Sequence, residues 1–414
     1  MISLEDARER ILARAHVLPS EKRSPLDALG QVLAEDVRAG FSIPPSDNAA
    51  MDGYAVRADD TTGASPEAPR ALQVIAELPA GQAPTLAVAP GTAIRIMTGA
   101  PVPPGADAIV QFELTDEPAD RRAAPRRADR VAILVAAKPG QSIRRAGEDI
   151  QAGEVVLTKG TELRPAEVGV LASLGLTEVA VVRGPRVAIL STGDELLSPG
   201  EERRPGAIYD ANSYAIGALV RRYGGEPIML GIARDRVDEL VARVRMGLAA
   251  DMLITSAGVS AGDYDVVKDV LAAEGEIGFW QVRMKPGRPL AFGQIQGVPF
   301  VGLPGNPVAS IVAFEQFVRP ALFRMQGKTK LIKPEVEARL VGSASNGDRR
   351  RCFLRAVVSR ESGDYVARIT VGQGSGVLSS LARANALVII PEEISRVDTG
   401  DRVRAQMLDW PEVE

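Results

Sequence analysis

Four carboxylates follow two short apolar segments in the middle of the chain, and oxygen ligands at this spacing could bind a hard metal ion. Asp194 and Glu195 end the segment VAILSTGDE, and Asp263 and Asp265 end the segment MLITSAGVSAGDYD. Proteins hold Mg²⁺ with one or two carboxylates together with the phosphate oxygens of a ligand. Asp194 and Asp263 also stand where helix N-caps belong, and capping and metal binding can coexist.

Glycine-containing turns follow three apolar segments between residues 187 and 307. Short continuous apolar segments are typical of buried parallel strands, whose carboxyl ends carry the ligand-binding loops of an open α/β sheet. Backbone N–H groups at such turns bind anions, so we predict one rim that binds phosphate or another oxyanion. Ordinary strand-to-helix turns are the alternative interpretation. The expected contacts are Ser191, Thr192, Gly193, Ser256, Gly258, Ser260, Gly262, Pro304, Gly305, Asn306 and Pro307.

Positive charge for an oxyanion is predicted at Lys285 and Arg288, in the segment MKPGRP. The chain has one cysteine, Cys352, and one histidine, His16. These counts exclude an intrachain disulfide and a Cys/His zinc site, and they leave acid–base chemistry to Asp, Glu, Lys or Tyr. The predicted site therefore works by positioning and electrostatics, without a covalent nucleophile.

The composition predicts a globular protein of several domains. The 414 residues exceed one usual domain, and roughly two to four are expected. A net charge of −4 and an aromatic content of 4% argue against nucleic-acid and membrane partners. The N-terminus MISLEDARER lacks the apolar core of a signal peptide, and no segment approaches the ~18 apolar residues of a membrane helix. A cytoplasmic location is therefore expected.

The elements that position these residues follow from hydrophobic spacing. Residues 185–327 alternate strand-like and helical segments, which predicts a parallel sheet. Helices are expected there at 212–223, 236–249, 264–273 and 308–325. Ser3 and Asp6 predict the cap of an N-terminal helix. A second helix is expected at residues 25–35 and a strand at 36–43.

Two further regions read as β-rich, because short apolar segments alternate with Gly and Pro turns. Strands are expected at 72–78, 93–97, 108–112, 131–135, 336–340, 352–358, 365–369, 386–390 and 401–407. Thr98 follows one of these strands, and Ser375 lies in the turn GQGSG, so both are candidates to face a ligand. Asp52 lies in a loop that two prolines stiffen, which is either a ligand-binding loop or an ordered turn between domains.

Seven segments, in this order, resemble the molybdopterin molybdenumtransferase family, which includes MoeA-type enzymes and the gephyrin E domain. They are PPSDNAAMDGYAVRADD, RIMTGAPVPPGADAIV, SIRRAGEDI, AILSTGDEL, SAGVSAGDYD, MKPGRP and LPGNPVAS. Each segment alone is a weak signal, but the set spans nearly the whole chain.

The resemblance implies a multidomain α/β plus β fold. It has a MoCF-type α/β sheet domain, two β-rich domains and a small mixed N-terminal domain. The expected boundaries are 1–47 with 145–182 for the discontinuous mixed domain, 48–144 for the first β-rich domain, 183–328 for the molybdopterin-binding α/β domain and 329–414 for a C-terminal β-barrel-like domain.

The activity that the resemblance implies is insertion of molybdate into adenylated molybdopterin, with Mg²⁺ and with release of AMP. The family resemblance also implies a homodimer whose site is shared between protomers. Asp52, Thr98 and Asp149 would face the site from the partner protomer. Lys285, Arg288 and the turn at 304–307 would lie near molybdate or phosphate. The implied catalytic residues are Asp52, Asp149, Asp265, Lys285 and Arg288, and the implied metal ligands are Asp194, Glu195, Asp263 and Asp265.

Several residues depart from the family pattern. Ala49 and Ala257 replace a common Ser and Gly, and Arg288 replaces a frequent Lys, which keeps the charge but changes its geometry. Ala309 stands where the family commonly has Ser. Ser310 follows it and could contact the ligand, but it points about 100° away on a helix. The choice between molybdate and tungstate therefore stays open.

Two other function classes remain as alternatives. One is a gephyrin-like scaffold, which would use the same fold to bind a partner protein and would tolerate loss of Asp52 and Asp265. The other is a nucleotide-dependent transferase or pyrophosphatase that shares only the α/β domain. The loop that contains Asp52 argues against the second, because such a protein needs neither that loop nor the β-rich domain beside it.

Overall fold

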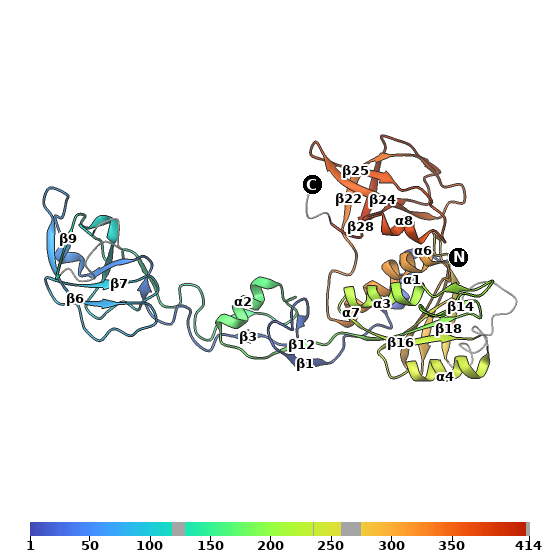
Figure 1. The fold of residues 1–414 in the computed structure, drawn as a ribbon, viewed down its shortest axis with the longest axis horizontal. Coiled ribbons are helices and arrows are strands. Elements are labelled where there is room, and N and C mark those ends of the chain that lie inside the picture. Colours follow the sequence, from blue (N-terminus) through green and yellow to red (C-terminus); the bar gives the residue numbers. More distant parts are fainter. Residues whose placement is uncertain (118–128, 235, 258–274, 411–414) are drawn as a thin grey trace. The chain divides into compact units, whose positions relative to one another are not determined.

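The computed structural model describes residues 1–117, 129–234, 236–257 and 275–410 (Figure 1). The chain divides into two compact units. The first unit contains Met1–Ala34, Gly160–Val168 and Thr177–Glu414, and the second contains Glu35–Lys159 and Gly169–Leu176. Within the described ranges, no helix is long and apolar enough to cross a membrane.

A six-stranded sheet forms the centre of the first unit. Its order is β16 (Glu226–Ala233), β13 (Arg186–Thr192), β17 (Met252–Ser256), β21 (Val298–Leu303), β20 (Pro289–Ile295) and β18 (Glu276–Gln281). The first four strands are parallel, but β20 pairs antiparallel with β21 and β18. The expected all-parallel sheet is therefore wrong at this edge. Only Gln296 and Gly297, both at positive φ, join β20 to β21, and a two-residue turn can join only antiparallel strands.

Helices cover both faces of this sheet. On one face lie α3 (Asn212–Arg222), α6 (Pro307–Ala313), the π-helical turn η3 (Phe314–Val318) and α7 (Arg319–Met325), and on the other lies α4 (Val237–Gly247). Successive residues of β13 face opposite sides, so Ile189 belongs to the core of the first face and Leu190 to the core of the second. The helices expected at 212–223, 236–249 and 308–325 are confirmed, and the one expected at 264–273 lies outside the described residues.

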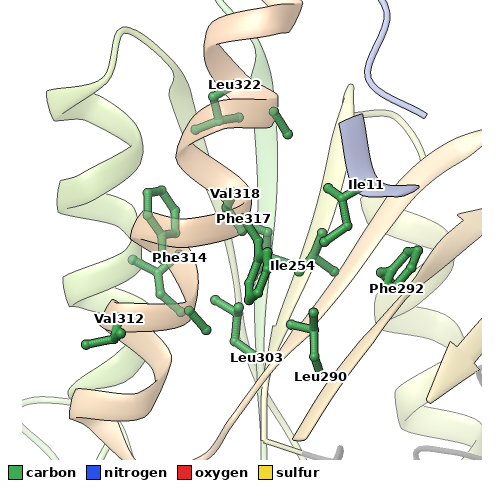
Figure 2. Packing of buried hydrophobic residues seen from close by; sticks show 14 of the residues in the cluster. Ile11, Ile254, Leu290, Phe292, Leu303, Val312, Phe314, Phe317, Val318 and Leu322 are labelled. Atoms are coloured by element: carbon green, nitrogen blue, oxygen red, sulfur yellow. The ribbon is translucent and has the colours of Figure 1, made fainter. Parts of the chain in front are cut away.

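The larger core lies under the helical stretch from α6 to α7. Figure 2 shows Phe314, Phe317 and Leu322 of this stretch together with Ile254 and Leu303 of the sheet. Full burial of each such side chain contributes about 1.5–3 kcal/mol relative to exposure. This packing holds the carboxyl ends of β17 and β21 in place.

The N-terminal helix α1 (Leu4–Leu12) joins the same core. Asp6 N–H donates to Ser3 Oγ at 3.0 Å, which confirms the predicted cap. Leu4, Ala7 and Ile11 are buried on the face that the helical spacing predicts.

The second helix expected at residues 25–35 is wrong. Residues 25–30 form turns that leave Leu26 74% exposed, and Gly30 at φ +78° directs the chain into β2 (Val32–Leu33). The strand β12 (Val179–Val182) lies between β2 and β1 (Ser20–Arg23), and pairing with it buries Val32 and Leu33. The leucine spacing imitates a helix, but strand pairing decides the local structure.

A closed β-barrel forms the C-terminal part of the first unit. Its strands are β24 (Arg351–Glu361), β25 (Asp364–Ile369), β22 (Glu335–Val341), β28 (Arg402–Met407) and β26 (Ala386–Ile390), and β26 pairs back with β24. These strands match the predicted ones. The short β19 (Met284–Lys285) adds to β24, with Lys285 opposite Cys352. Smaller elements here are β23 (Ala344–Ser345), β27 (Arg396–Val397), α8 (Leu378–Ala382), and, beside the central sheet, β14 (Leu196–Leu197) and β15 (Ile208–Tyr209).

The second unit is built on a five-stranded sheet. Its order is β8 (Ala108–Gln111), β5 (Gly53–Val56), β7 (Thr92–Ile96), β6 (Arg70–Leu78) and β9 (Arg130–Ile133). The strand expected at 36–43 shortens to β3 (Val37–Arg38), which pairs with β11 (Val155–Leu157). Other short elements are β4 (Asn48–Ala49), β10 (Ile143–Arg144), η1 (Ala58–Thr61) and η2 (Phe112–Leu114). The helix α2 (Pro165–Ser173) begins in the first unit and ends in the second.

Candidate functional site

A cavity of about 990 Å³ lies in the first unit, between the carboxyl ends of parallel strands and the C-terminal barrel. Thr192 ends β13, Ser256 ends β17 and Pro304 follows β21, and all three line the cavity. The predicted convergence of strand-end turns is therefore present for these three strands. The opposite wall comes from the start of β24 and from residues 373–375.

The turn after β13 presents Glu195 to the cavity. Gly193 has φ +140°, and a Cβ there would stand 2.4 Å from Glu195 Oε2, so only glycine leaves room for this carboxylate. Glu195 and Thr192 line the cavity, whereas Ser191 is fully buried behind it. The backbone carbonyl of Asp194 accepts hydrogen bonds from two arginine side chains, those of Arg204 and Arg234.

Asn212 connects two of the turns, and its role was not predicted from the sequence. Its side-chain Nδ2 donates to Ser256 Oγ at 2.8 Å and to the backbone carbonyl of Gly305 at 2.7 Å. Asn212 also lines the cavity. Beside it, Asp210 accepts from the N–H of Ser213 at 3.1 Å and from its hydroxyl at 2.5 Å, which stabilises the start of α3. The sequence signal was the cluster of polar residues at the start of the predicted helix.

The third predicted turn, at residues 304–307, also lines the cavity. Ala309 follows on the cavity wall, whereas Ser310 is 1% exposed and is not part of the cavity wall. The structure thus places Ala309, and not Ser310, on the cavity wall. Ser375 lines the opposite wall, and its carbonyl accepts from Val308 N–H at 3.1 Å.

Four cationic residues line the cavity: Lys285, Arg288, Arg350 and Arg355. The first two were predicted, and the arginines of the barrel were missed. Arg288 Nη2 donates to Gln281 Oε1 at 2.7 Å. The sequence signal for Arg355 was its position inside an apolar strand segment, because a charged residue at such a position needs a reason beyond strand formation.

Arg355 is a buried cation with neutral neighbours. It is 1% exposed, Nε donates to Ser380 Oγ at 3.1 Å, and Nη2 donates to the carbonyls of Gly372 and Gly374 at 3.2 and 3.1 Å. Burial lowers the pKa of the Arg355 guanidinium. Among the residues that the structure describes, no carboxylate pairs with this guanidinium, and a buried charge without a counterion is costly. An anionic ligand would supply the missing counterion.

Three predicted residues lie in the second unit. Asp52 Oδ1 accepts from Thr98 N–H at 2.8 Å and from its hydroxyl at 2.7 Å, so these two residues lie together. Asp149 is exposed, and its N–H donates to the carbonyl of Ile43 at 3.0 Å. Five further predicted residues lie outside the described ranges: Gly258, Ser260, Gly262, Asp263 and Asp265.

The carboxylates of the described cavity wall suit a cation that needs few protein ligands. Glu195 and Asp210 line the cavity, but Asp210 is engaged by Ser213. No group of three His, Cys, Asp or Glu side chains that could hold a metal occurs in the described parts of the chain. Mg²⁺ commonly takes only one or two carboxylates and completes its shell with ligand phosphates and water, so Glu195 fits that chemistry.

Family models match most of the chain. The description "MoeA N-terminal region (domain I and II)" matches residues 2–175, "Probable molybdopterin binding domain" matches 188–324, and "MoeA C-terminal region (domain IV)" matches 338–408. The chain belongs to the MoeA family. The cavity thus lies between the second and third matched regions of this MoeA-family chain, and the family and fold class expected from the sequence motifs are confirmed.

Relatives in the MoeA family match nearly end to end. Molybdopterin molybdenumtransferase 2 of Mycobacterium tuberculosis is 44% identical over 385 residues, which cover 91% of this chain and 92% of the relative. Molybdopterin molybdenumtransferase of Nostoc sp. is 38% identical, with 91% of this chain and 86% of the relative covered. The crystal structure of a molybdopterin biosynthesis MoeA protein from Pyrococcus horikoshii has a TM-score of 0.81 at 33% identity, with 98% of this chain and 100% of that chain covered.

Proposed function

We propose that this chain is a molybdopterin molybdenumtransferase that inserts molybdate into adenylated molybdopterin and releases AMP in molybdenum cofactor biosynthesis. The observation that carries the proposal is a cavity with two kinds of wall. Buried Arg355, with Lys285, Arg288 and Arg350, forms a cationic wall, and strand-end turns form the other. Family membership and the names of the relatives support the same activity.

The cationic wall suits a tetrahedral oxyanion. The guanidinium groups of Arg288 and Arg355 and the Lys285 ammonium group supply fixed positive charge, and Arg355 needs no reorganisation because three acceptors already hold its Nε and Nη2. In the proposal, these side chains bind molybdate and stabilise charge that develops as the phosphate bond breaks. In the proposal, the turns at 192–195, 256–257 and 304–307 bind the phosphate groups of adenylated molybdopterin.

Mg²⁺ is part of the proposal. Glu195 would hold the ion beside the ligand phosphate, with Asp194, Asp263 and Asp265 as the other predicted ligands. When bound, Mg²⁺ neutralises phosphate charge and stabilises the leaving AMP. The protein side chains then only orient the two substrates and exclude water.

The homodimer with a shared site, the cytoplasmic location and the four domain boundaries given above also belong to the proposal. Asp52, Thr98 and Asp149 would contribute from the second unit of the partner protomer. The two hydrogen bonds between Asp52 and Thr98 support a role in ligand binding, because they hold the two side chains together in a fixed arrangement.

The test is AMP release from adenylated molybdopterin by the purified full-length chain. We expect release only when both molybdate and Mg²⁺ are present. An Asp265→Ala variant should lose turnover more than stability, whereas equal loss of both would indicate a structural helix cap. A chain that yields no AMP from this substrate would refute the proposal and favour the scaffold alternative, which needs neither metal nor molybdate.

A further inference from the structure

Asp348 pairs with two of the cations that line the cavity. Arg350 Nε donates to Asp348 Oδ2 at 3.0 Å, and Arg350 Nη2 donates to the same oxygen. Lys285 Nζ lies 3.6 Å from this oxygen. The hydrogen bond from Arg350, with the charges of Arg350 and Lys285, holds the pKa of the Asp348 carboxyl below its usual value. The carboxylate is therefore charged at neutral pH.

Strand pairing explains why these three residues meet. β19 runs parallel beside the start of β24, so Met284 lies opposite Arg351 and Lys285 opposite Cys352. Asp348 and Arg350 lie in the loop just before β24. Asn346 anchors that loop, because it is fully buried and its Nδ2 donates to the carbonyls of Pro391 and Ile394, each at 3.2 Å. The loop thus holds Asp348 next to the cations.

The four cavity-lining cations divide into two kinds. Arg288 and Arg355 donate to neutral acceptors, whereas Lys285 and Arg350 share one carboxylate. Asp348 is not part of the cavity wall itself, and its side chain is 39% exposed. A partly exposed carboxylate regains water when it leaves its partners, so such a pair exchanges easily.

We propose that Asp348 sets the oxyanion affinity of this site, as an internal carboxylate that competes with the incoming oxyanion for Lys285 and Arg350. This rests on the proposed function only in that the cavity must bind a tetrahedral oxyanion. The ligand displaces the Asp348 carboxylate from both cations, so part of the binding free energy is spent in breaking that pair. Asp348 thereby weakens binding and eases product release.

The experiment measures binding of inorganic molybdate, and of sulfate for comparison, to the full-length chain by titration calorimetry at low salt. Asp348→Asn removes the competing charge and keeps the shape. We expect it to tighten molybdate binding about two- to five-fold, the range that corresponds to an exposed ion pair. Asp348→Glu keeps the charge and should bind like the parent chain. Thermal unfolding checks that each variant is folded.

Asp398→Asn is the matched control. Asp398 pairs with Arg396 two residues away, as Asp348 does with Arg350, and it lies in a loop beside the same barrel but not on the cavity wall. Its loss should leave molybdate affinity unchanged. The gain from Asp348→Asn should also shrink at high salt and disappear when Lys285→Gln and Arg350→Gln are present, because the cations that it frees are then absent.

Unchanged or weaker binding in Asp348→Asn overturns the inference, and so does an equal gain in Asp398→Asn, which would indicate general charge repulsion. A parent chain that binds neither anion refutes both this inference and the oxyanion wall of the proposed function. If the variants change molybdate affinity as expected but the chain releases no AMP, the proposed reaction is refuted and the role of Asp348 stands.

Discussion

The side-chain amide of Asn212 donates to both Ser256 Oγ and the Gly305 carbonyl, and it thereby ties the end of β17 to the turn that precedes α6. Two strand-end turns that are far apart in the sequence thus share one nitrogen atom. Asn212 lies at the start of α3, whose buried face fixes its position. The cavity wall therefore depends on a helix that contributes few of its lining residues.

Replacement of Asn212 should loosen both turns. We expect Asn212→Ala to raise the KM for adenylated molybdopterin by about ten-fold or more, since removal of two hydrogen bonds at about 1 kcal/mol each is of that size. The KM for molybdate should change less, because the cationic wall is intact. Tyr214→Ala, an exposed change in the same helix, is the control. Equal effects of the two variants on KM would contradict the positioning role.

Arg355→Gln should separate activity from stability. We expect kcat/KM for molybdate to fall by at least about 100-fold, because a preorganised charge at the oxyanion is lost. The free energy of unfolding should change little, because removing a desolvated cation offsets the lost hydrogen bonds.

Arg319→Gln is the control for Arg355, because Arg319 is also buried and burial also lowers its pKa, but it does not line the cavity. It should keep kcat/KM but lose more stability than Arg355→Gln, because the Arg319 guanidinium also packs over the rings of Tyr223 and Phe323. Denaturant unfolding and AMP release should be measured on both variants. Equal effects of Arg355→Gln and Arg319→Gln on stability and on kcat/KM would contradict the role of Arg355 at the oxyanion.

A shared site predicts complementation between two inactive variants. Asp52→Ala and Lys285→Ala should each abolish AMP release. When the two are co-expressed, half of the dimers are mixed, and each mixed dimer carries one site with neither change. Activity should therefore return to about a quarter of the parent value per site. No recovery, although mixed dimers form, would place both residues in one chain's site.

Glu195→Gln should raise the Mg²⁺ concentration needed for half-maximal AMP release by about ten-fold or more, as expected when a metal loses a carboxylate. Asp194→Asn should have a smaller effect, because Glu195 lines the cavity and Asp194 does not. A larger effect of Asp194→Asn than of Glu195→Gln on the Mg²⁺ requirement would assign the metal to Asp194.

Asp251 should make stability depend on pH. It accepts two hydrogen bonds from Arg183, each at 2.6 Å, and one from Arg186 N–H at 2.8 Å. Burial raises the pKa of Asp251, but these hydrogen bonds outweigh burial, so its pKa in the folded chain is lowered. The stabilisation is therefore present above the unfolded-state pKa of about 3.9 and is lost as pH falls through the lower folded-state value.

Asp251→Asn should cost about 1–3 kcal/mol at pH 7 and flatten the fall in stability below about pH 4. Urea unfolding over this pH range measures both effects. Glu178→Gln, which removes an exposed pair with Lys22, should change stability by no more than about 0.5 kcal/mol. An unchanged pH profile in Asp251→Asn would contradict the linkage.

The sequence alone determined the features whose causes are local. The Ser3 cap, the strand-end turns and the barrel strands follow from side-chain hydrogen bonding, glycine backbone freedom and apolar spacing, and the structure has them where they were predicted. The family motifs likewise required only the order of residues along the chain. Lys285 and Arg288 were predicted from their charge, and their segment also carries a family motif.

Only the tertiary structure decided the features that depend on long-range pairing. Pairing with β12 turned residues 32–33 from the expected helix into a strand, and a two-residue turn reversed β20 against β21. Arg355 looked like an ordinary strand residue, and Asn212 like the first residue of a helix. Their roles depend on acceptor groups more than 15 residues away that the fold brings within hydrogen-bonding distance, and no local pattern encodes such contacts.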